Sequence, residues 1–255
     1  MNVPLIDLSH GDAYRQARAI DDALCGCGFF GIVGHGVPEP ARAAAFAAAH
    51  RFFALPQATK ERWHIDRWPL QRGYDPIGWQ ALDPSQPADL KESFYLGEEH
   101  LGPNQWPDEA LLPGFQQACQ AWSAQMQALA RRMMGLFERA LTLLAQDDAG
   151  GLQVGQRDGS WLDVAPAPDA MVVNIGDMMQ RWTNDRWPST LHRVINRHGG
   201  RERWSIAYFF DLDPAARIEP LASCVSAQRP ALYAPITAGE HLAAMYRRTT
   251  VAAGT

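Results

Sequence analysis

The sequence lacks several features that would place the protein in common classes. Its 255 residues include no apolar run of membrane-spanning length, and its first residues have neither the basic nor the apolar region of a secretory signal. The formal net charge of −5 gives no electrostatic support for binding nucleic acid or an anionic membrane. These absences favour a cytoplasmic protein that binds neither nucleic acid nor a membrane.

Cysteine is also scarce, and its positions suggest no covalent or metal framework. Four cysteines in 255 residues are too few and too scattered for a disulfide scaffold. Cys25 and Cys27 flank a glycine, but no second pair completes a zinc site. We interpret both as small packing residues at the end of a helix.

The hydrophobic pattern changes once along the chain. Helical spacing or composition marks residues 12–25, 39–53 and 114–138. After Gly150-Gly151 the chain breaks into short β runs at 152–154, 160–165, 170–175, 192–196 and 203–211. Helices followed by short strands predict a mixed α and β fold, a double-stranded β-helix (jelly roll) core buttressed by N-terminal and central helices.

His192, Arg203 and Ser205 are the most informative residues. A neutral imidazole such as that of His192 can ligate a divalent metal ion. Arg203 and Ser205 are two apart in a predicted strand, so both side chains project from the same face and can clamp a carboxylate. A metal ligand near a carboxylate clamp predicts an iron centre that binds a keto acid.

These residues also have plainer interpretations. His192 taken alone is more compatible with a core or edge-strand histidine bonded to the backbone, and Arg203 alone could be a surface cation. The alternating Ile206, Tyr208 and Phe210 predict that the strand is largely buried, however, and a buried guanidinium needs an anionic partner. We therefore favour the clamp role for Arg203, whereas the ligand role of His192 depends on the resemblance described next.

This set resembles the C-terminal half of the site in non-haem Fe(II), 2-oxoglutarate-dependent oxygenases of the isopenicillin N synthase-like family. The resemblance extends, in the family's order, over residues 3–8, 28–38, 142–154, 173–177 and 233–240. It implies an N-terminal oxygenase-family region at 1–110. A long helix and a jelly-roll region for iron and 2-oxoglutarate would follow at 111–255, within one compact unit.

The resemblance also implies the chemistry. Fe(II) would be bound by His192, and 2-oxoglutarate would be held through its distal carboxylate by Arg203 and Ser205, with no catalytic residue beyond the metal site. Molecular oxygen and a small organic substrate would complete the reaction, a hydroxylation, desaturation or ring closure carried out by a monomer. Asn174, Arg72 and Tyr74 are candidates for the substrate pocket. Isopenicillin N synthase itself uses no 2-oxoglutarate, so an oxidase of that type stays open.

The first half of the iron site is not where the family has it. A His-x-Asp pair is expected just before the strand at 141–144, but counting back gives Gly135 and Phe137, which cannot bind iron. The long helix also meets the strand without a cap or turn. We expect that pair on a segment missing between Ala140 and Leu141, and a second gap near 99–101. If the chain is complete, it would be an inactive jelly roll that binds a small carboxylate.

His64-Ile65-Asp66 matches the expected His-x-Asp motif but is far from the expected position before the strand at 141–144. The motif follows the charged run 60–62, shortly after the second predicted helix. It lies too early in the chain to sit on a strand beside His192. We interpret it as a solvated helix end that enters a loop.

Overall fold

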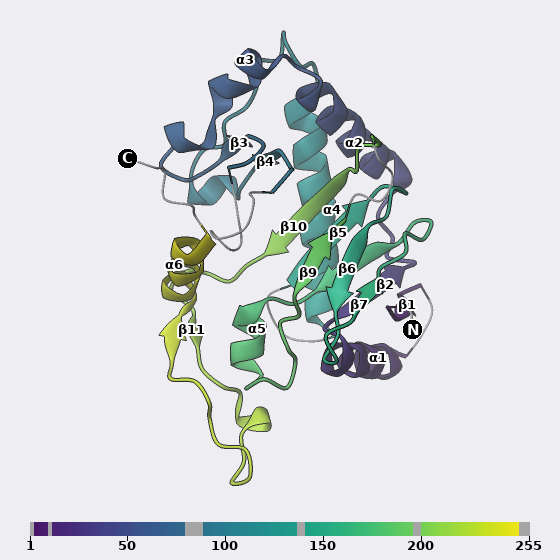
Figure 1. Ribbon diagram of the computed structural model, residues 1–255, viewed down its shortest axis with the longest axis vertical. Coiled ribbons are helices and arrows are strands. Elements are labelled where there is room, and N and C mark those ends of the chain that lie inside the picture. The colour runs from purple at the N-terminus through teal and green to yellow at the C-terminus, as the bar shows by residue number, and fades with distance from the viewer. Residues whose placement is uncertain (1–2, 10–11, 80–88, 137–140, 196–199, 250–255) are drawn as a thin grey trace. The chain divides into compact units, whose positions relative to one another are not determined.

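The computed structural model describes residues 3–9, 12–79, 89–136, 141–195 and 200–249 (Figure 1). It divides into two compact units. The first comprises Met1–Glu39 and Ser123–His241, and the second Pro40–Trp122 and Leu242–Thr255. The regional boundary at residue 110 stays a prediction. No helix in the described ranges is both long and apolar enough to cross a membrane.

The first unit contains a five-stranded sheet. Its strands, in spatial order, are β1 (Leu5–Asp7), β2 (Phe29–Val33), β8 (Met171–Asn174), β5 (Leu141–Gln146) and β10 (Ser205–Phe210). β1 and β2 are parallel and the other pairs are antiparallel. Side chains alternate between faces, so Phe29, Asn174, Thr142 and Phe209, paired in register, lie in one row on one face.

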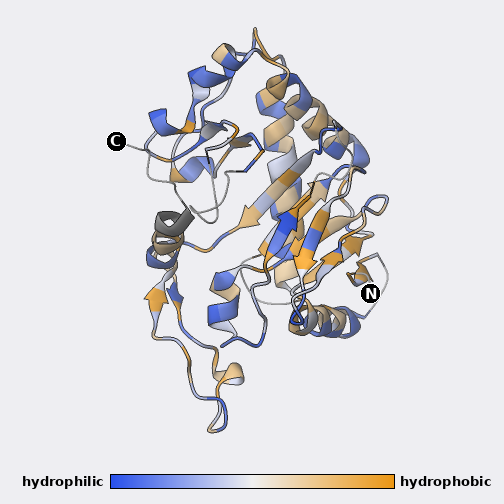
Figure 2. Ribbon diagram, in the orientation of Figure 1, coloured by the Kyte–Doolittle hydropathy of each residue, from blue (hydrophilic) through white to orange (hydrophobic). Residues whose placement is uncertain are grey.

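A three-stranded antiparallel sheet packs against that face. It runs β7 (Trp161–Asp163), β6 (Leu152–Gly155), β9 (His192–Val194), which leaves β9 at an edge among the described strands. One apolar cluster joins the two sheets, with members Phe29, Leu152, Val154, Val164 and Val172. Strands of both sheets are mostly hydrophobic in Figure 2. Two sheets packed over a shared core confirm the predicted jelly roll.

Helices complete the first unit. α1 (Ala13–Gly26) begins where the Asp12 carboxylate accepts the backbone N–H of Tyr14, and it buries Ile20, Ala23 and Leu24. In the C-terminal part of α4 (Phe115–Met134), Arg132 donates to the carbonyls of Leu8 and His35. The other elements are α5 (Asp177–Trp182), β11 (Arg217–Ile218), the 3-10 turn Ala222–Cys224, β12 (Ile236–Thr237) and α6 (Ala238–Thr249), which continues into the second unit.

The second unit is built around Phe52. This ring, at the end of α2 (Glu39–Phe53), lies 4.5 to 6.1 Å from the rings of Trp63, Tyr74, Phe94 and Phe115. α3 (Gln57–Lys60) and the 3-10 turns Glu61–Trp63, Ile65–Arg67 and Glu99–Leu101 surround an antiparallel pair, β3 (Gly73–Asp75) and β4 (Ser93–Tyr95). The aromatic cluster supplies the apolar burial that stabilises this unit.

The predicted elements correspond closely to those observed. The helix predicted over 114–138 ends earlier, at Met134. The sequence pattern did not indicate α3, α5, α6, β3, β11 or β12. Phe137 and Ala140 lie outside the described residues, and Leu141 is the first described residue after them. The segment predicted to be missing between Ala140 and Leu141 therefore stays a prediction.

The chain passes from β5 to β6 through Gly150 and Gly151. Both have positive φ, 71° and 83°, a region that favours glycine. The Gly151 carbonyl accepts the N–H of Ile195, just after β9, at 2.8 Å, and the Gly150 carbonyl accepts Arg203 Nε at 3.0 Å. This turn therefore anchors both segments that carry the predicted site residues.

We expect Gly151→Ala to lower the free energy of unfolding by about 2–5 kcal/mol. An added Cβ would lie 2.2 Å from the Ile195 carbonyl oxygen, and φ would stay strained. Gly150→Ala is the matched control. Its Cβ would make only an ordinary contact, 3.5 Å from Pro166, so the cost is the backbone strain of about 1–2 kcal/mol. Urea denaturation measures both, and equal losses would contradict the role of the Ile195 contact.

Candidate functional site

Arg203 is held by three contacts just before β10. Nε donates to the Gly150 carbonyl at 3.0 Å, Nη2 to Gln146 Oε1 at 3.0 Å, and Nη1 to Ser205 Oγ at 3.2 Å. The last contact confirms that Arg203 and Ser205 project from the same side. A guanidinium has five N–H donors, so one N–H on each terminal nitrogen has no partner among the described residues.

The charge of Arg203 is not neutralised by a direct partner. All three acceptors are neutral, and within the described ranges no carboxylate pairs with this half-buried side chain. Burial lowers the pKa of the guanidinium, and the nearby Asp147 carboxylate partly opposes this effect. A desolvated cation with two free donors and an adjacent exposed hydroxyl is suited to bind a carboxylate.

Gln146 was missed by the sequence analysis. It is the last residue of β5, 6% exposed, and lies directly opposite Ser205 in the β5–β10 register. Its amide oxygen fixes one end of the Arg203 guanidinium. Alternation along 142–146 indicates only which face its side chain occupies, because the pairing register is set by the folded sheet.

The prediction that β10 is largely buried is wrong. Its burial alternates, with Ile206, Tyr208 and Phe210 half-buried and the intervening residues exposed, Phe209 at 59%. The reason is that, among the described residues, the three-stranded sheet covers this face on β2 and β8 but not on β10, so Ser205 and Phe209 stay exposed. Arg203 owes its partial burial to the glycine turn and β5 rather than to β10.

His192 is exposed at the start of β9. Its Nδ1 lies 3.3 Å from the Thr190 carbonyl, and its ring meets Phe29 edge-on with centroids 5.3 Å apart. In β9 it pairs with Val154, whose side chain belongs to the core between the sheets. If Nδ1 carries the proton and donates to Thr190, Nε2 keeps the lone pair that a metal requires.

Asn174 and His192 both adjoin Phe29, the first as its register partner and the second by a ring contact. Asn174 ends β8, half-buried, and is the register partner of both Phe29 and Thr142. Phe209 is in the same row, four residues along β10 from Ser205, which corresponds to about 14 Å of strand. The open face therefore runs from the Arg203–Ser205 pair to the row that contains Asn174.

The described residues do not form a complete metal site. Among them, no group of three or more His, Cys, Asp or Glu side chains could hold a metal ion. His192 is thus a single candidate ligand without described companions. Gly135, one of the two positions where the family resemblance predicts a metal ligand, lies in a turn after α4. Glycine has no side chain that could bind the metal.

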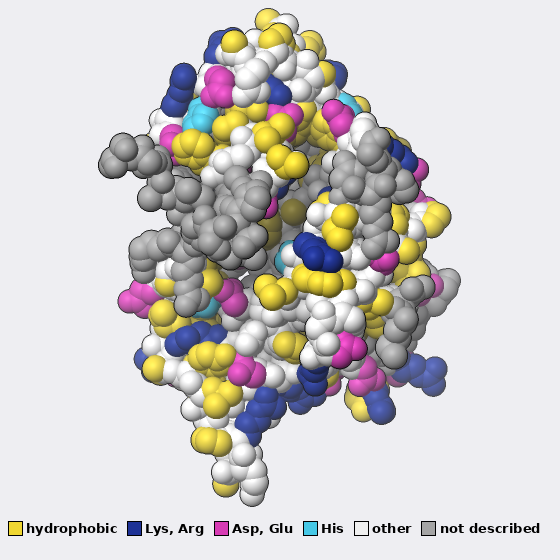
Figure 3. All heavy atoms as spheres, in the orientation of Figure 1, with side chains coloured by type: hydrophobic (Ala, Val, Ile, Leu, Met, Phe, Trp, Pro, Cys, Tyr) yellow, Lys and Arg dark blue, Asp and Glu magenta, His cyan; other side chains and the backbone are white. Residues whose placement is uncertain are grey.

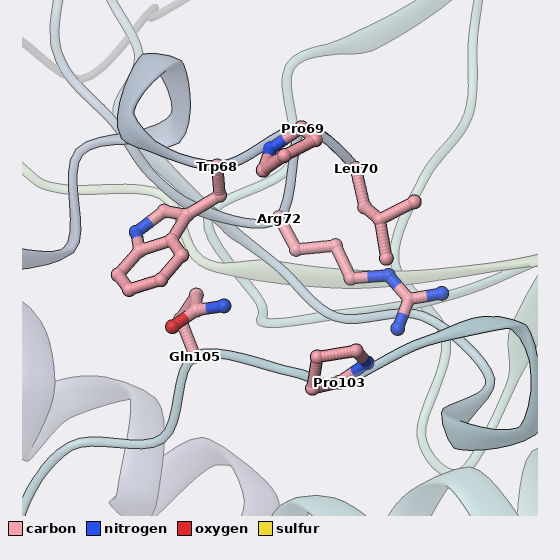
Figure 4. Close-up of a pocket in the computed structure, with 6 residues that line it drawn as sticks. All are labelled: Trp68, Pro69, Leu70, Arg72, Pro103 and Gln105. Carbon is pink, nitrogen blue, oxygen red and sulfur yellow. The ribbon is translucent and has the colours of Figure 1, made fainter.

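Arg72 and Tyr74 belong to the second unit, and their hydrogen-bond partners are all found there. Arg72, 8% exposed, donates to the carbonyls of Glu98 and Gly102 and to Asn104 Oδ1, which secures the loop around Gly97. It lines a cavity of about 180 Å³ with five other residues (Figure 4), namely Trp68, Pro69, Leu70, Pro103 and Gln105. A substrate role for Arg72 stays a prediction.

Tyr74 is a core residue, 1% exposed. Its hydroxyl donates to Glu92 Oε2 at 2.6 Å, and Lys60 Nζ pairs with the same oxygen at 2.6 Å. Burial and the bond to Glu92 raise the pKa of the Tyr74 hydroxyl. These contacts stabilise the second unit, and a pocket role for Tyr74 stays a prediction.

The motif His64-Ile65-Asp66 has a structural explanation. His64 Nδ1 accepts the backbone N–H of Asp66 at 3.2 Å and so caps the 3-10 turn Ile65–Arg67. The His64 ring meets Trp79 edge-on with centroids 4.8 Å apart. Both His64 and Asp66 are in the second unit, whereas His192 is in the first.

The described residues on the face drawn in Figure 3 form no large patch of one charge. Basic and acidic side chains are interspersed on the face drawn in Figure 3, with hydrophobic and uncharged residues between them. This distribution agrees with the modest net charge of −5. A site for a small molecule fits such a surface.

Comparison with known proteins assigns both parts of the chain. Residues 3–109 match the family model described as non-haem dioxygenase in morphine synthesis N-terminal, and residues 137–212 match the 2OG-Fe(II) oxygenase superfamily. A 2-oxoglutarate-Fe(II) type oxidoreductase of Emericella nidulans is 31% identical, over 96% of this chain and 90% of the relative. A 2-oxoglutarate-dependent dioxygenase of Monascus ruber is also 31% identical, over 86% and 87%.

Solved structures give the same result. A full-length Neurospora crassa protein crystallised in complex with alpha-KG superposes with a TM-score of 0.84 at 27% identity, over 96% of this chain and 95% of that one. A putative 2OG-Fe(II) oxygenase of Caulobacter crescentus gives 0.85 at 26% identity, over 96% and 98%. The alignment to the Emericella relative spans 318 positions although this chain has 255 residues, so it opens gaps in this chain.

Asp75, beside Tyr74, provides a test of buried charge in the second unit. It is 2% exposed, Oδ1 has no hydrogen-bond partner among the described residues, and burial raises the pKa of its carboxyl from 3.8 to about 6, which Lys91 partly opposes. Because the folded state binds this proton more tightly than the unfolded state, the ionised carboxyl reduces stability above about pH 6 and has no such effect below about pH 4.

We therefore expect Asp75→Asn to raise the free energy of unfolding by about 1–3 kcal/mol near pH 8, and by less near pH 4.5. Urea denaturation at the two pH values measures the difference. Asp66→Asn, at an exposed position in the same unit, should give a smaller gain near pH 8, because the Asp66 carboxylate adds less than burial does to the raised pKa of Asp75. A gain of equal size at both pH values would show that ionisation of Asp75 is not the cause.

Proposed function

The chain belongs to the 2-oxoglutarate–Fe(II) oxygenase superfamily and is an Fe(II)- and 2-oxoglutarate-dependent dioxygenase of small organic molecules, and from this premise we propose that Arg203 and Ser205 bind the distal carboxylate of 2-oxoglutarate. The observation that carries the proposal is the environment of Arg203. This half-buried guanidinium has only neutral partners within the described residues. An anionic ligand supplies the missing charge.

The geometry accounts for selectivity toward a carboxylate. One free N–H on each terminal nitrogen of Arg203 matches the two oxygens of a carboxylate. Ser205 Oγ accepts from Nη1, so its own hydroxyl hydrogen remains to be donated to the ligand. The about 14 Å of open face between Ser205 and the Asn174 row leaves space for a five-carbon dicarboxylate.

We propose His192 as one iron ligand, although the residues described here do not fit a complete iron site. A facial triad needs two histidines and a carboxylate, and no described residue joins His192. We propose that the remaining ligands are a His-x-Asp pair on an additional segment inserted between Ala140 and Leu141. The gapped alignment supports this proposal, as does the edge of β9 that pairs with no strand among the described residues.

The finer properties of the enzyme are also proposals. Molecular oxygen would be the oxidant, Asn174 a contact of the substrate or cosubstrate, and the protein a cytoplasmic monomer. All four cysteines are free, as in a reducing compartment. The comparisons do not favour an oxidase without 2-oxoglutarate or an inactive carboxylate-binding protein.

The 255-residue chain should not bind Fe(II) at micromolar concentrations, because one exposed imidazole does not replace three ligands. Peptide mapping of the protein from its own cells should reveal additional residues between Ala140 and Leu141. That longer form should bind Fe(II) in a titration, lose it in His192→Ala and retain it in His64→Ala. A peptide joining Ala140 directly to Leu141, in protein that still binds micromolar Fe(II), would refute the assignment.

Arg203→Ala should weaken 2-oxoglutarate binding by at least about 30-fold in calorimetry, because truncating one side of a buried charged pair costs on the order of 2–5 kcal/mol. Arg203→Lys keeps the charge but loses the planar fork, so the loss should be intermediate. Ser205→Ala should cost about 1 kcal/mol, or roughly fivefold. An unchanged Kd in Arg203→Ala would mean that the guanidinium is purely structural.

A further inference from the structure

Gln146 is the neutral side chain that contacts Nη2 of Arg203. We propose that Gln146 is a positioning residue for the cosubstrate, because its neutral amide directs the Arg203 guanidinium without neutralising it. This inference rests on the proposed binding of 2-oxoglutarate by Arg203. It goes further by assigning a specificity role to a residue outside the Arg203–Ser205 pair.

The contacts of Gln146 fix the orientation of the guanidinium. Gln146 Oε1 accepts from Nη2 and the Gly150 carbonyl accepts from Nε, both at 3.0 Å. Two acceptors on a rigid planar group define its plane and direction. The Gln146 side chain is 6% exposed and lies within the β5–β10 pairing, so its position is itself well fixed.

The absence of a negative charge at this position is significant. A carboxylate in place of the amide, at the same 3.0 Å, would form an ion pair with Arg203 and compete with the ligand. Asp147, the next residue, has a carboxylate, but its oxygens accept the backbone N–H groups of Ala149 and Trp204 at 3.0 and 2.9 Å. That carboxylate therefore acts on Arg203 only from a distance.

A second glutamine–arginine contact provides an internal comparison. Arg193 Nε donates to Gln153 Oε1 at 3.0 Å in the three-stranded sheet. There the Gln153 amide also donates to Asp163 Oδ1 at 2.8 Å, and the Arg193 guanidinium stacks 4.0 Å from the centre of the Trp161 ring. Gln153 is 4% exposed, so it matches Gln146 in residue type, burial and partner.

The experiment uses three variants of the full chain, titrated with 2-oxoglutarate by calorimetry and melted without ligand. Gln146→Glu should weaken binding by about 10- to 100-fold while the Tm of the free protein is kept or raised, because the new ion pair replaces the ligand. Gln146→Leu should weaken binding only severalfold and lower Tm. Gln153→Glu should leave the affinity unchanged, whatever its effect on Tm.

The opposite movement of affinity and Tm in Gln146→Glu separates positioning from support of the fold. Wild-type affinity in that variant would overturn the inference and leave the proposed cosubstrate site intact. Parallel losses of affinity and Tm in both Gln146 variants would also overturn it, since they would indicate a structural role alone. If the wild-type chain failed to bind 2-oxoglutarate, the proposed function itself would fail, and this inference with it.

Discussion

Two consecutive glycines with positive φ decide where the functional side chains lie. Gly150 and Gly151 allow the chain to leave β5 of one sheet and begin β6 of the other within a single turn. Their carbonyls then accept Arg203 Nε and the Ile195 N–H. The carboxylate clamp and the strand of the candidate metal ligand are thus fixed to the same short segment. Any residue with a Cβ would strain this turn.

The site is preorganised at the expense of stability. Partial burial of an arginine beside neutral acceptors lowers its pKa and leaves an uncompensated charge in the free protein. An internal carboxylate would relieve this but would also occupy the clamp. The neighbouring carboxylate of Asp147 instead accepts hydrogen bonds from the backbone N–H groups of Ala149 and Trp204. Under the proposed function, the carboxylate of 2-oxoglutarate completes the charge balance, which would couple cosubstrate binding to stability.

The sequence predicted this site in part, for identifiable reasons. A spacing of two in a strand placed Arg203 and Ser205 on one side, because side-chain alternation is a local property. Gln146 is 57 residues before its partner Arg203, and only the pairing of β5 with β10 brings them together. Burial of β10 was mispredicted because apolar residues at alternate positions indicate a preferred face but not whether another element covers it.

The two halves of the site depend on different parts of the fold. The carboxylate clamp uses β5, β10 and the glycine turn, all of which are described and hydrogen-bonded to one another. The metal half instead depends on β9, which has β6 on one side and no described strand on the other. A strand added there would lie beside His192 and leave the contacts of Arg203 unchanged. The proposed cosubstrate site at Arg203 is therefore structurally independent of His192, the proposed iron ligand, and of any strand that pairs with β9.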